Sequence, residues 1–123
     1  MPHVKLELSS NILEEIDERA LFSSIHQILA HSLAADIGRC MSRLIQHEHF
    51  HIGEGSSTNA FIYLEISCFA GRTPPMIKEA GEKLLKTLQQ YFSASANKLN
   101  IQIAVNILEF PAENYFKIEP QKI

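Results

Sequence analysis

The pattern that most constrains the fold is a strand–helix–strand order that occurs twice along the chain. Each half opens with alternating apolar and polar residues, and Leu6-Glu7-Leu8-Ser9 resembles Leu64-Glu65-Ile66-Ser67. Alternation with a period of two is typical of a strand that buries one face. A short repeat at matching points of two equal element orders favours two related halves within one sheet. We therefore predict an α+β fold, an α/β plait with a mixed four-stranded sheet.

The first half, about residues 1–52, is expected to contain a strand at 4–8, a helix and a second strand. Apolar residues at helical spacing predict the helix, which should end near Ser32; they are Leu21, Phe22, Ile25, Ile28 and Leu29. Alternation around residues 39–44 predicts a strand within 37–50. Glycine and serine residues at 53–59 indicate a loop.

The second half, about residues 59–110, repeats this order. Residues 60–69 are rich in β-branched and aromatic side chains, which favours a strand. Thr73 is suited to cap a helix that has Pro74 at its first position and ends at residues 93–97. A last strand at 99–110 should stop at Pro111, and residues 111–123 form a tail. The whole chain, 1–123, is predicted to be a single domain.

The connections predict how the layers are arranged. Right-handed crossovers in both halves place both helices on the same face of the sheet. The other face then has no cover within the chain, and apolar residues there predict burial against other subunits. We therefore expect a homo-oligomer.

Composition excludes several functional classes. At 123 residues, 46% hydrophobic and 20% charged, the chain is typical of a globular protein, and its net charge of -3 disfavours nucleic-acid and anionic-membrane partners. Cys40 and Cys68 fit no metal spacing and are expected to be reduced, buried thiols. The sequence shows no signal peptide and no apolar run that would span a membrane, so we expect a cytoplasmic protein.

The amino-terminal residues Met1-Pro2-His3 hold the first candidate for chemistry. If Met1 is removed, Pro2 becomes a free secondary amine and a possible general base. If Met1 stays, the same nitrogen is an amide with almost no basicity. Keto–enol isomerisation needs a base whose pKa lies near the working pH. Partial burial and nearby arginines both lower the pKa of an amine.

The chain resembles the 5-carboxymethyl-2-hydroxymuconate isomerase family of the tautomerase superfamily. The resembling stretches lie in order along nearly the whole sequence: Met1-Pro2-His3, Asn11-Ile12, Glu14-Glu15, Asp17, Leu21-Phe22, Ser42-Arg43, Ala70-Gly71-Arg72, Ala80-Gly81-Glu82 and Phe116-Lys117. The resemblance implies a homotrimer of tautomerase-like β-α-β-β-α-β subunits, an amino-terminal proline as catalytic base and no cofactor. It also implies a small-molecule substrate from aromatic-acid degradation, a 2-hydroxymuconate with several carboxylates.

The predicted site combines Pro2 with arginines that would bind carboxylates, lower the pKa of the amine and stabilise a dienolate. Arg43 and Arg72 are the first candidates. The family carries Arg-Ser-Arg on its second strand where this chain has Met41-Ser42-Arg43. Arg39 lies two residues earlier, with the same strand parity, and is a possible replacement. The alternatives are a strand-edge or interface charge for Arg43, a solvated loop charge for Arg72 and an ordinary surface residue for Arg39.

Other polar residues suggest weaker hypotheses. His47, His49 and His51 would share one face of an extended segment, a spacing that suits zinc or nickel, but no cysteine or carboxylate completes the set and we predict no metal site. His3 either lines the site or packs beside it, and Lys117 is interpreted as a surface lysine. Two alternative functions stay open: a hydratase-type enzyme with Pro2 as acid, and a non-catalytic trimeric binding protein if Met1 is retained.

Overall fold

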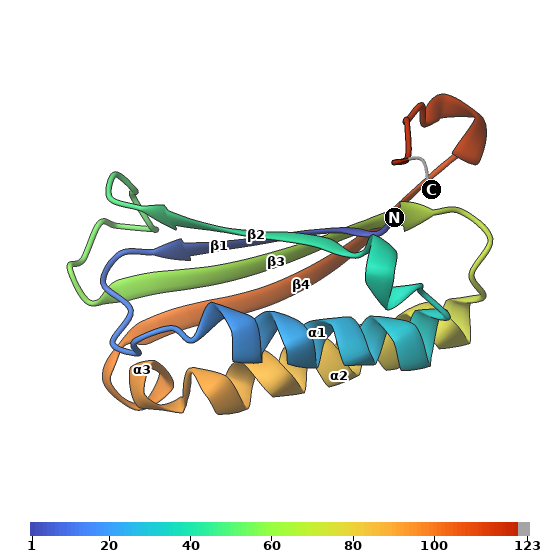
Figure 1. Cartoon of the computed structure of the whole chain (residues 1–123). Coiled ribbons are helices and arrows are strands. Elements are labelled where there is room, and N and C mark those ends of the chain that lie inside the picture. Colours follow the sequence, from blue (N-terminus) through green and yellow to red (C-terminus); the bar gives the residue numbers. More distant parts are fainter. Residues whose placement is uncertain (121–123) are drawn as a thin grey trace.

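The computed structural model describes residues 1–120 as a four-stranded sheet with helices packed on it (Figure 1). The elements in chain order are β1 His3–Ser9, α1 Glu18–Leu33, η1 Ile37–Arg39, β2 Met41–His47, β3 Asn59–Phe69, α2 Pro74–Tyr91, α3 Ser93–Lys98, β4 Asn100–Phe110 and η2 Ala112–Asn114. The last three residues of the predicted tail lie outside the described residues. The strand order is β2-β1-β3-β4, with β1 and β3 antiparallel and each outer strand parallel to its neighbour. The predicted mixed four-stranded sheet is confirmed.

The two halves meet around a local two-fold axis in the middle of the sheet. Leu6 of β1 pairs with Leu64 of β3, so the two similar four-residue segments lie against each other in antiparallel register. Each half is a β-α-β unit with parallel strands. This register is the one expected of two related halves, although the repeat itself stays an interpretation.

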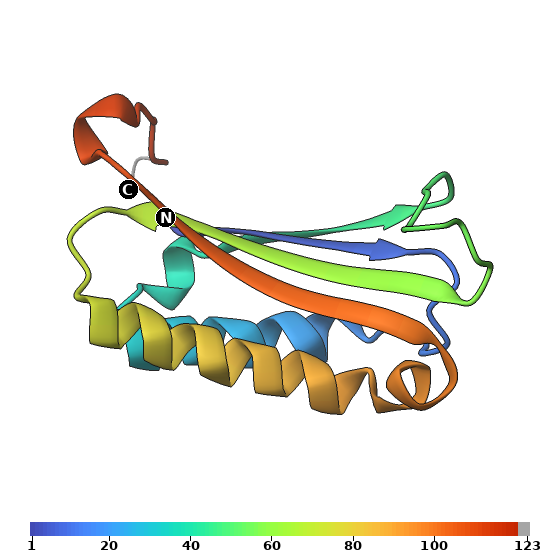
Figure 2. The ribbon, with the colours of Figure 1, turned by 180° about the vertical axis from the view of Figure 1, so that it is seen from behind.

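The hydrophobic core lies between the sheet and the two long helices. Figures 1 and 2 show α1 and α2 on the same face of the sheet, as predicted. Alternate residues of β1 and β3 point into this layer, where they meet the apolar faces of α1 and α2. The fully buried members are Val4, Leu6, Leu8, Leu21, Ile25, Leu29, Leu33, Ala60, Ile62, Leu64, Ile66, Ala80, Leu84, Leu88 and Phe92.

Local sequence fixes where both long helices begin. The Asp17 side chain accepts a hydrogen bond from the backbone N–H of Ala20 at 3.1 Å, which satisfies one free donor at the start of α1. The Thr73 side chain does the same for Met76, and Pro74 occupies the first turn of α2. The predicted cap and proline positions are therefore confirmed.

Two local predictions are wrong. Residues 37–39 form the 3-10 helix η1, capped by the Asp36 side chain, instead of the start of a strand. Arg39 therefore precedes β2 and does not share its alternation. Residues 93–98 form the short helix α3 rather than a simple helix end, because the buried Ser95 bonds through its backbone N–H and its hydroxyl to the carboxylate of Glu14.

The face of the sheet opposite the helices carries both polar cross-strand pairs and apolar side chains. Lys5 and Glu65 form an ion pair across β1 and β3 at 3.7 Å, and His47 contacts Glu7 at 3.4 Å. The same face also carries exposed apolar side chains of the outer strands, as predicted: Met41 and Ile45 of β2 and Leu108 of β4. The other large exposed apolar residues lie in helices, loops and the tail: Leu13, Ile37, Phe50, Leu85, Phe116 and Ile118.

Two further predictions can be compared with the structure. Cys68 is buried, as predicted, whereas Cys40 is partly exposed, and both are free thiols. Among residues 1–120, no helix has the length and apolar character needed to cross a membrane.

Candidate functional site

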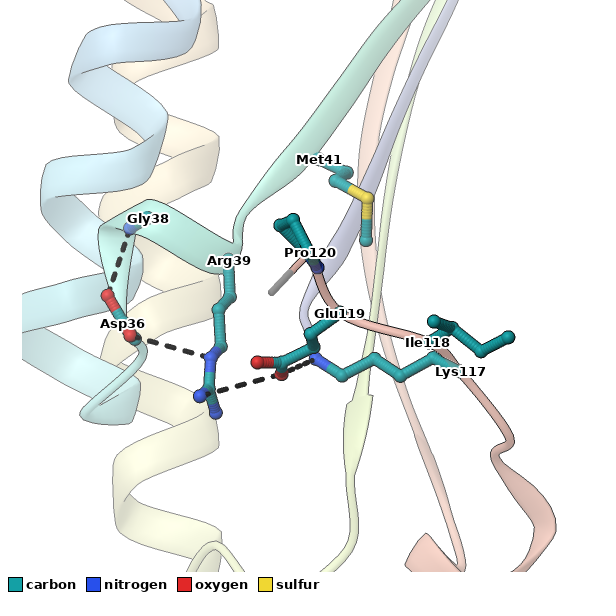
Figure 3. A pocket seen from close by; sticks show the side chains of 8 residues that line it. All are labelled: Asp36, Gly38, Arg39, Met41, Lys117, Ile118, Glu119 and Pro120. Carbon is teal, nitrogen blue, oxygen red and sulfur yellow. Dashed lines mark hydrogen bonds and ion pairs between the residues drawn. The ribbon is translucent and has the colours of Figure 1, made fainter. Parts of the chain in front are cut away.

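A cavity of about 520 Å³ lies next to the amino terminus, where two segments distant in sequence face each other (Figure 3). One wall comes from η1 and the start of β2, and the other comes from the tail after η2. The lining residues are Asp36, Gly38, Arg39, Met41, Lys117, Ile118, Glu119 and Pro120. The cavity therefore combines charged side chains from both segments with apolar side chains from Met41 and Ile118.

The amino terminus is fixed beside this cavity by backbone contacts. The amino group of Met1 donates a hydrogen bond to the carbonyl oxygen of Arg39 at 3.3 Å. The carbonyl oxygen of Pro2 accepts one from the N–H of Met41 at 3.1 Å, and both Met1 and Pro2 are buried. Burial is the main cause that lowers the pKa of the terminal amine, and the charge of Lys117 lowers it further. The environment of the amino terminus thus favours a neutral amine.

Arg39 and Lys117 share one carboxylate inside the cavity. Arg39 Nη2 lies 3.5 Å from Glu119 Oε1, and Lys117 Nζ lies 2.7 Å from the same oxygen (Figure 3). Arg39 Nε also lies 3.7 Å from Asp36 Oδ2. The hydrogen bond from Lys117 is the main cause that lowers the pKa of Glu119, so this carboxylate is ionised. The cavity therefore already holds an anion between two cations.

His3 connects Arg43 to Tyr115 beside the amino terminus. Arg43 Nη1 and Nη2 donate to His3 Nδ1 at 3.2 and 2.7 Å, which leaves the proton of the neutral ring on Nε2. His3 Nε2 then donates to the Tyr115 hydroxyl at 2.9 Å. Burial first, and the Arg43 charge second, lower the pKa of His3. A neutral histidine thus holds the Arg43 guanidinium on the open face of the sheet, two residues along β2 from the cavity residue Met41.

Arg72 connects the ends of two core elements. Its Nε donates to the carbonyl oxygen of Leu33, in the last turn of α1, at 3.0 Å. Its Nη1 donates to the carbonyl oxygen of Phe69, at the end of β3, at 2.8 Å. Arg72 is not among the residues that line the cavity. Two of the five N–H groups of Arg72 are thus directed to backbone carbonyls, so a substrate would meet the remaining N–H groups on Nη1 and Nη2.

We expect Arg72→Ala to lower the free energy of unfolding by roughly 1–3 kcal/mol, because two backbone carbonyls lose their donor. Thermal or urea unfolding measures this change. Arg19→Ala, on the first turn of α1, is the matched control because its side chain is exposed. Unfolding at the wild-type midpoint, together with a loss of activity, would contradict this structural role.

Two half-buried histidines predict a pH dependence of stability. Burial lowers the pKa of His26, whose Nε2 lies 2.5 Å from Ser42 Oγ, and it is also the main cause for His3. The folded state therefore binds fewer protons than the unfolded state just below the usual histidine pKa of about 6.5. The contribution of these histidines to the free energy of unfolding should be fully present above this pH. It should decrease as the pH falls through their lowered pKa values in the folded state.

Equilibrium urea unfolding between pH 7 and pH 5 measures this decrease, since the affected carboxylates titrate at lower pH. The double variant His3→Gln/His26→Gln should flatten the profile. The exposed His49→Gln is the matched control and should keep the wild-type slope. An unchanged slope in the double variant would show that other groups cause the dependence.

The structure brings together part of the predicted site. Pro2 and Arg39 lie at the same end of the sheet, and Arg43 reaches this region through His3. Arg72 is directed to backbone carbonyls. Lys117, which the sequence suggested was a surface residue, lines the cavity, and Glu119 was not predicted. The stretch Phe116-Lys117 is part of the family resemblance, and this is the sequence signal that indicates a place for Lys117 in the site.

The histidine-rich segment forms no metal site in the described part of the chain. His47 ends β2 and contacts Glu7, while His49 and His51 lie in the following loop. Within residues 1–120, no group of three histidine, cysteine, aspartate or glutamate residues is arranged to hold a metal ion.

Comparison with known proteins identifies relatives over nearly the full length. The sequence profile of the 5-carboxymethyl-2-hydroxymuconate isomerase family matches residues 2–121. The 5-carboxymethyl-2-hydroxymuconate Delta-isomerase of Escherichia coli is 26% identical over 117 residues, which cover 95% of this chain and 93% of that protein.

Solved structures agree on the fold. A 5-carboxymethyl-2-hydroxymuconate isomerase from Deinococcus radiodurans R1 superimposes with a TM-score of 0.87 at 23% identity, covering 97% of this chain and 90% of the other. A fused 4-OT protein, described as a symmetric trimer, gives a TM-score of 0.70 at 14% identity, with coverages of 89% and 85%. The fold is that of the tautomerase superfamily, as predicted. The match of the family profile to almost every residue shows that the chain belongs to the 5-carboxymethyl-2-hydroxymuconate isomerase family.

Proposed function

We propose that this protein is a cofactor-free isomerase that moves a proton within a 2-hydroxymuconate-type di- or tricarboxylate. Pro2, as the free amino terminus after removal of Met1, is the general base. The observation that carries the proposal is the position of the amino terminus beside a cavity with two cations, where burial lowers the pKa of the Met1 amine that precedes Pro2. Such an amine can accept a proton at neutral pH.

The reaction needs one group that removes and returns a proton. The Pro2 nitrogen takes the proton of the 2-hydroxyl group, the carbonyl forms, and the double bonds shift along the chain of the substrate. The protonated nitrogen then delivers a proton to a carbon of the conjugated system. No atom is gained or lost overall, so the reaction requires neither an oxidant nor a further reactant.

The cationic side chains bind the substrate and stabilise its charge in this proposal. Arg39 and Lys117 lie at the cavity and bind carboxylates of the substrate, and they stabilise negative charge on the dienolate. Arg43, held by His3, is available on the open face for a second carboxylate. Arg72 is the least direct member because two of its five N–H groups are directed to backbone carbonyls. Met41, at a position where the family carries an arginine, makes this part of the cavity less cationic and more apolar.

We further propose a homotrimer, which is supported by the exposed surfaces of the chain. The outer strands β2 and β4 carry exposed apolar side chains such as Ile45, and Phe116 projects from the tail with 89% of its surface exposed. The structural relative with the fused 4-OT chain is a symmetric trimer. Sedimentation equilibrium should give three times the 13.9 kDa chain mass; the mass of one chain would contradict the trimer.

The test of the proposed function combines a mass with an activity. Intact-mass measurement should show a chain without Met1, and this protein should convert 5-carboxymethyl-2-hydroxymuconate, followed by its ultraviolet absorbance. NMR titration of the Pro2 nitrogen should find a neutral amine at pH 7. A charged amine would favour the hydratase-type alternative. Complete retention of Met1 would favour a non-catalytic binding protein.

A further inference from the structure

The carboxylate of Glu119 lies between two cations that line the cavity. Arg39 and Lys117 approach the same oxygen of Glu119 at 3.5 and 2.7 Å, from opposite walls of the cavity (Figure 3). Within residues 1–120, neither cation donates to a backbone carbonyl in the way that Arg72 does, and Arg39 also lies 3.7 Å from Asp36 Oδ2. This pair therefore has the geometry of a carboxylate-binding site whose present ligand belongs to the chain itself.

We propose that Arg39 and Lys117 form a carboxylate subsite, and that Glu119 is an internal ligand which a substrate carboxylate must displace. The proposal rests on the proposed function for the identity of the substrate, but the subsite itself is defined by the two cations. Glu119 then acts as a specificity-determining residue. A ligand is retained only if its own carboxylate replaces the contacts that Glu119 gives up.

Because the tail is exposed, displacing Glu119 from the two cations requires little free energy. The side chain of Glu119 is 50% exposed and that of Arg39 is 56% exposed, and ion pairs in such surroundings are weak. Tyr115 is the last aromatic anchor of the described tail, packing against Phe69 and Phe110. Ile118, one residue before Glu119, is 99% exposed and contributes no packing. The Glu119 carboxylate can therefore leave the two cations without disturbing the core.

The same geometry predicts which ligands the subsite accepts. A carboxylate places negative charge between Arg39 and Lys117 and restores both ion pairs after Glu119 has left. A neutral amide or ester at the same position restores neither ion pair, so Arg39 keeps its contact with Asp36 and the contact of Lys117 with Glu119 is not replaced. The subsite therefore selects anionic ends of a substrate, and its affinity should decrease as salt screens the two cations.

Binding of adipate, a saturated six-carbon dicarboxylate that cannot isomerise, tests the proposal by calorimetry. Glu119→Gln removes the internal anion and should tighten adipate binding by about 3- to 10-fold, because two exposed ion pairs no longer compete. Arg39→Gln and Lys117→Gln should each weaken binding by at least a similar factor. Glu113→Gln, an exposed carboxylate of the same tail in η2, is the matched control and should leave the affinity unchanged.

The outcomes separate this inference from the proposed function. Equal affinity of wild type and Glu119→Gln for adipate would overturn the inference, as would equal tightening by Glu113→Gln, which would indicate only a general charge effect. Adipamide, the neutral analogue, should bind more weakly than adipate to Glu119→Gln. Adipate binding is measured without turnover. A protein that is inactive but shows the predicted change in affinity would therefore contradict only the catalytic role of Pro2, and would leave the carboxylate subsite supported.

Discussion

Replacing Pro2 by alanine should remove most of the isomerase activity, and blocking its nitrogen should remove more. A chain that keeps an additional residue before Pro2 has an amide at this position and no base, so we expect a loss on the order of 10²- to 10⁴-fold in kcat. Pro2→Ala keeps a primary amine, whose usual pKa of about 7.7–8.0 leaves part of it neutral, and should retain some activity.

Absorbance assays with 5-carboxymethyl-2-hydroxymuconate measure both effects, with the amino-terminal mass verified for each preparation. Pro75→Ala, the same substitution at an exposed position in the first turn of α2, is the matched control and should have the wild-type rate. Adipate binding should be nearly unchanged in Pro2→Ala, because in the proposed mechanism the nitrogen removes a proton and does not hold the carboxylates. Full activity of the blocked chain would exclude Pro2 as the base.

The largest effect on stability is expected from Phe92→Ala. Phe92 is fully buried where α2 passes into α3, and its N–H donates to the carbonyl oxygen of Leu88 at 2.9 Å. Its carbonyl oxygen accepts from the N–H of Ala96 at 2.9 Å. Removing the ring leaves a cavity among core side chains, so we expect a loss of about 3–5 kcal/mol.

Thermal unfolding should show this loss as a decrease in Tm of roughly 10 °C or more for a domain of this size. Phe92→Leu keeps much of the volume and should lose less than half as much. Gln90→Ala, exposed on the last turn of α2, should unfold at the wild-type temperature. A decrease of only a few degrees for Phe92→Ala would mean that the surrounding core closes over the missing ring.

The sequence allowed most of the fold to be predicted because local and repeated signals agreed. The Thr73 cap and the alternation in both central strands depend on neighbouring residues only. The antiparallel contact of Leu6 with Leu64 could be anticipated from the short repeat, since related halves pack most simply around a two-fold axis. The short helix α3 was missed because its stability depends on Glu14, which is distant in sequence and bonds to Ser95.

The candidate site was harder to predict because it depends on long-range contacts. The alternation of Arg39 with Met41 suggested one strand, whereas the Asp36 cap turns this segment into a 3-10 helix. The proximity of Lys117 to Arg39 could not be read from their spacing, since it arises where the tail returns across the end of the sheet (Figure 2). A single sequence likewise gives no signal that the hydrogen-bond partners of Arg72 are backbone carbonyls.

The two-fold axis at Leu6 and Leu64 also limits how many bases one chain can provide. It relates the start of β1 to the start of β3, so the position equivalent to Pro2 is Ala60. Ala60 lies within the polypeptide, fully buried, and its nitrogen is an amide. Although the strands are arranged with near symmetry, a terminal amine exists at only one of the two ends. An inactivator selective for the amino-terminal amine should therefore reach full effect at one equivalent per chain, whatever the size of the assembly.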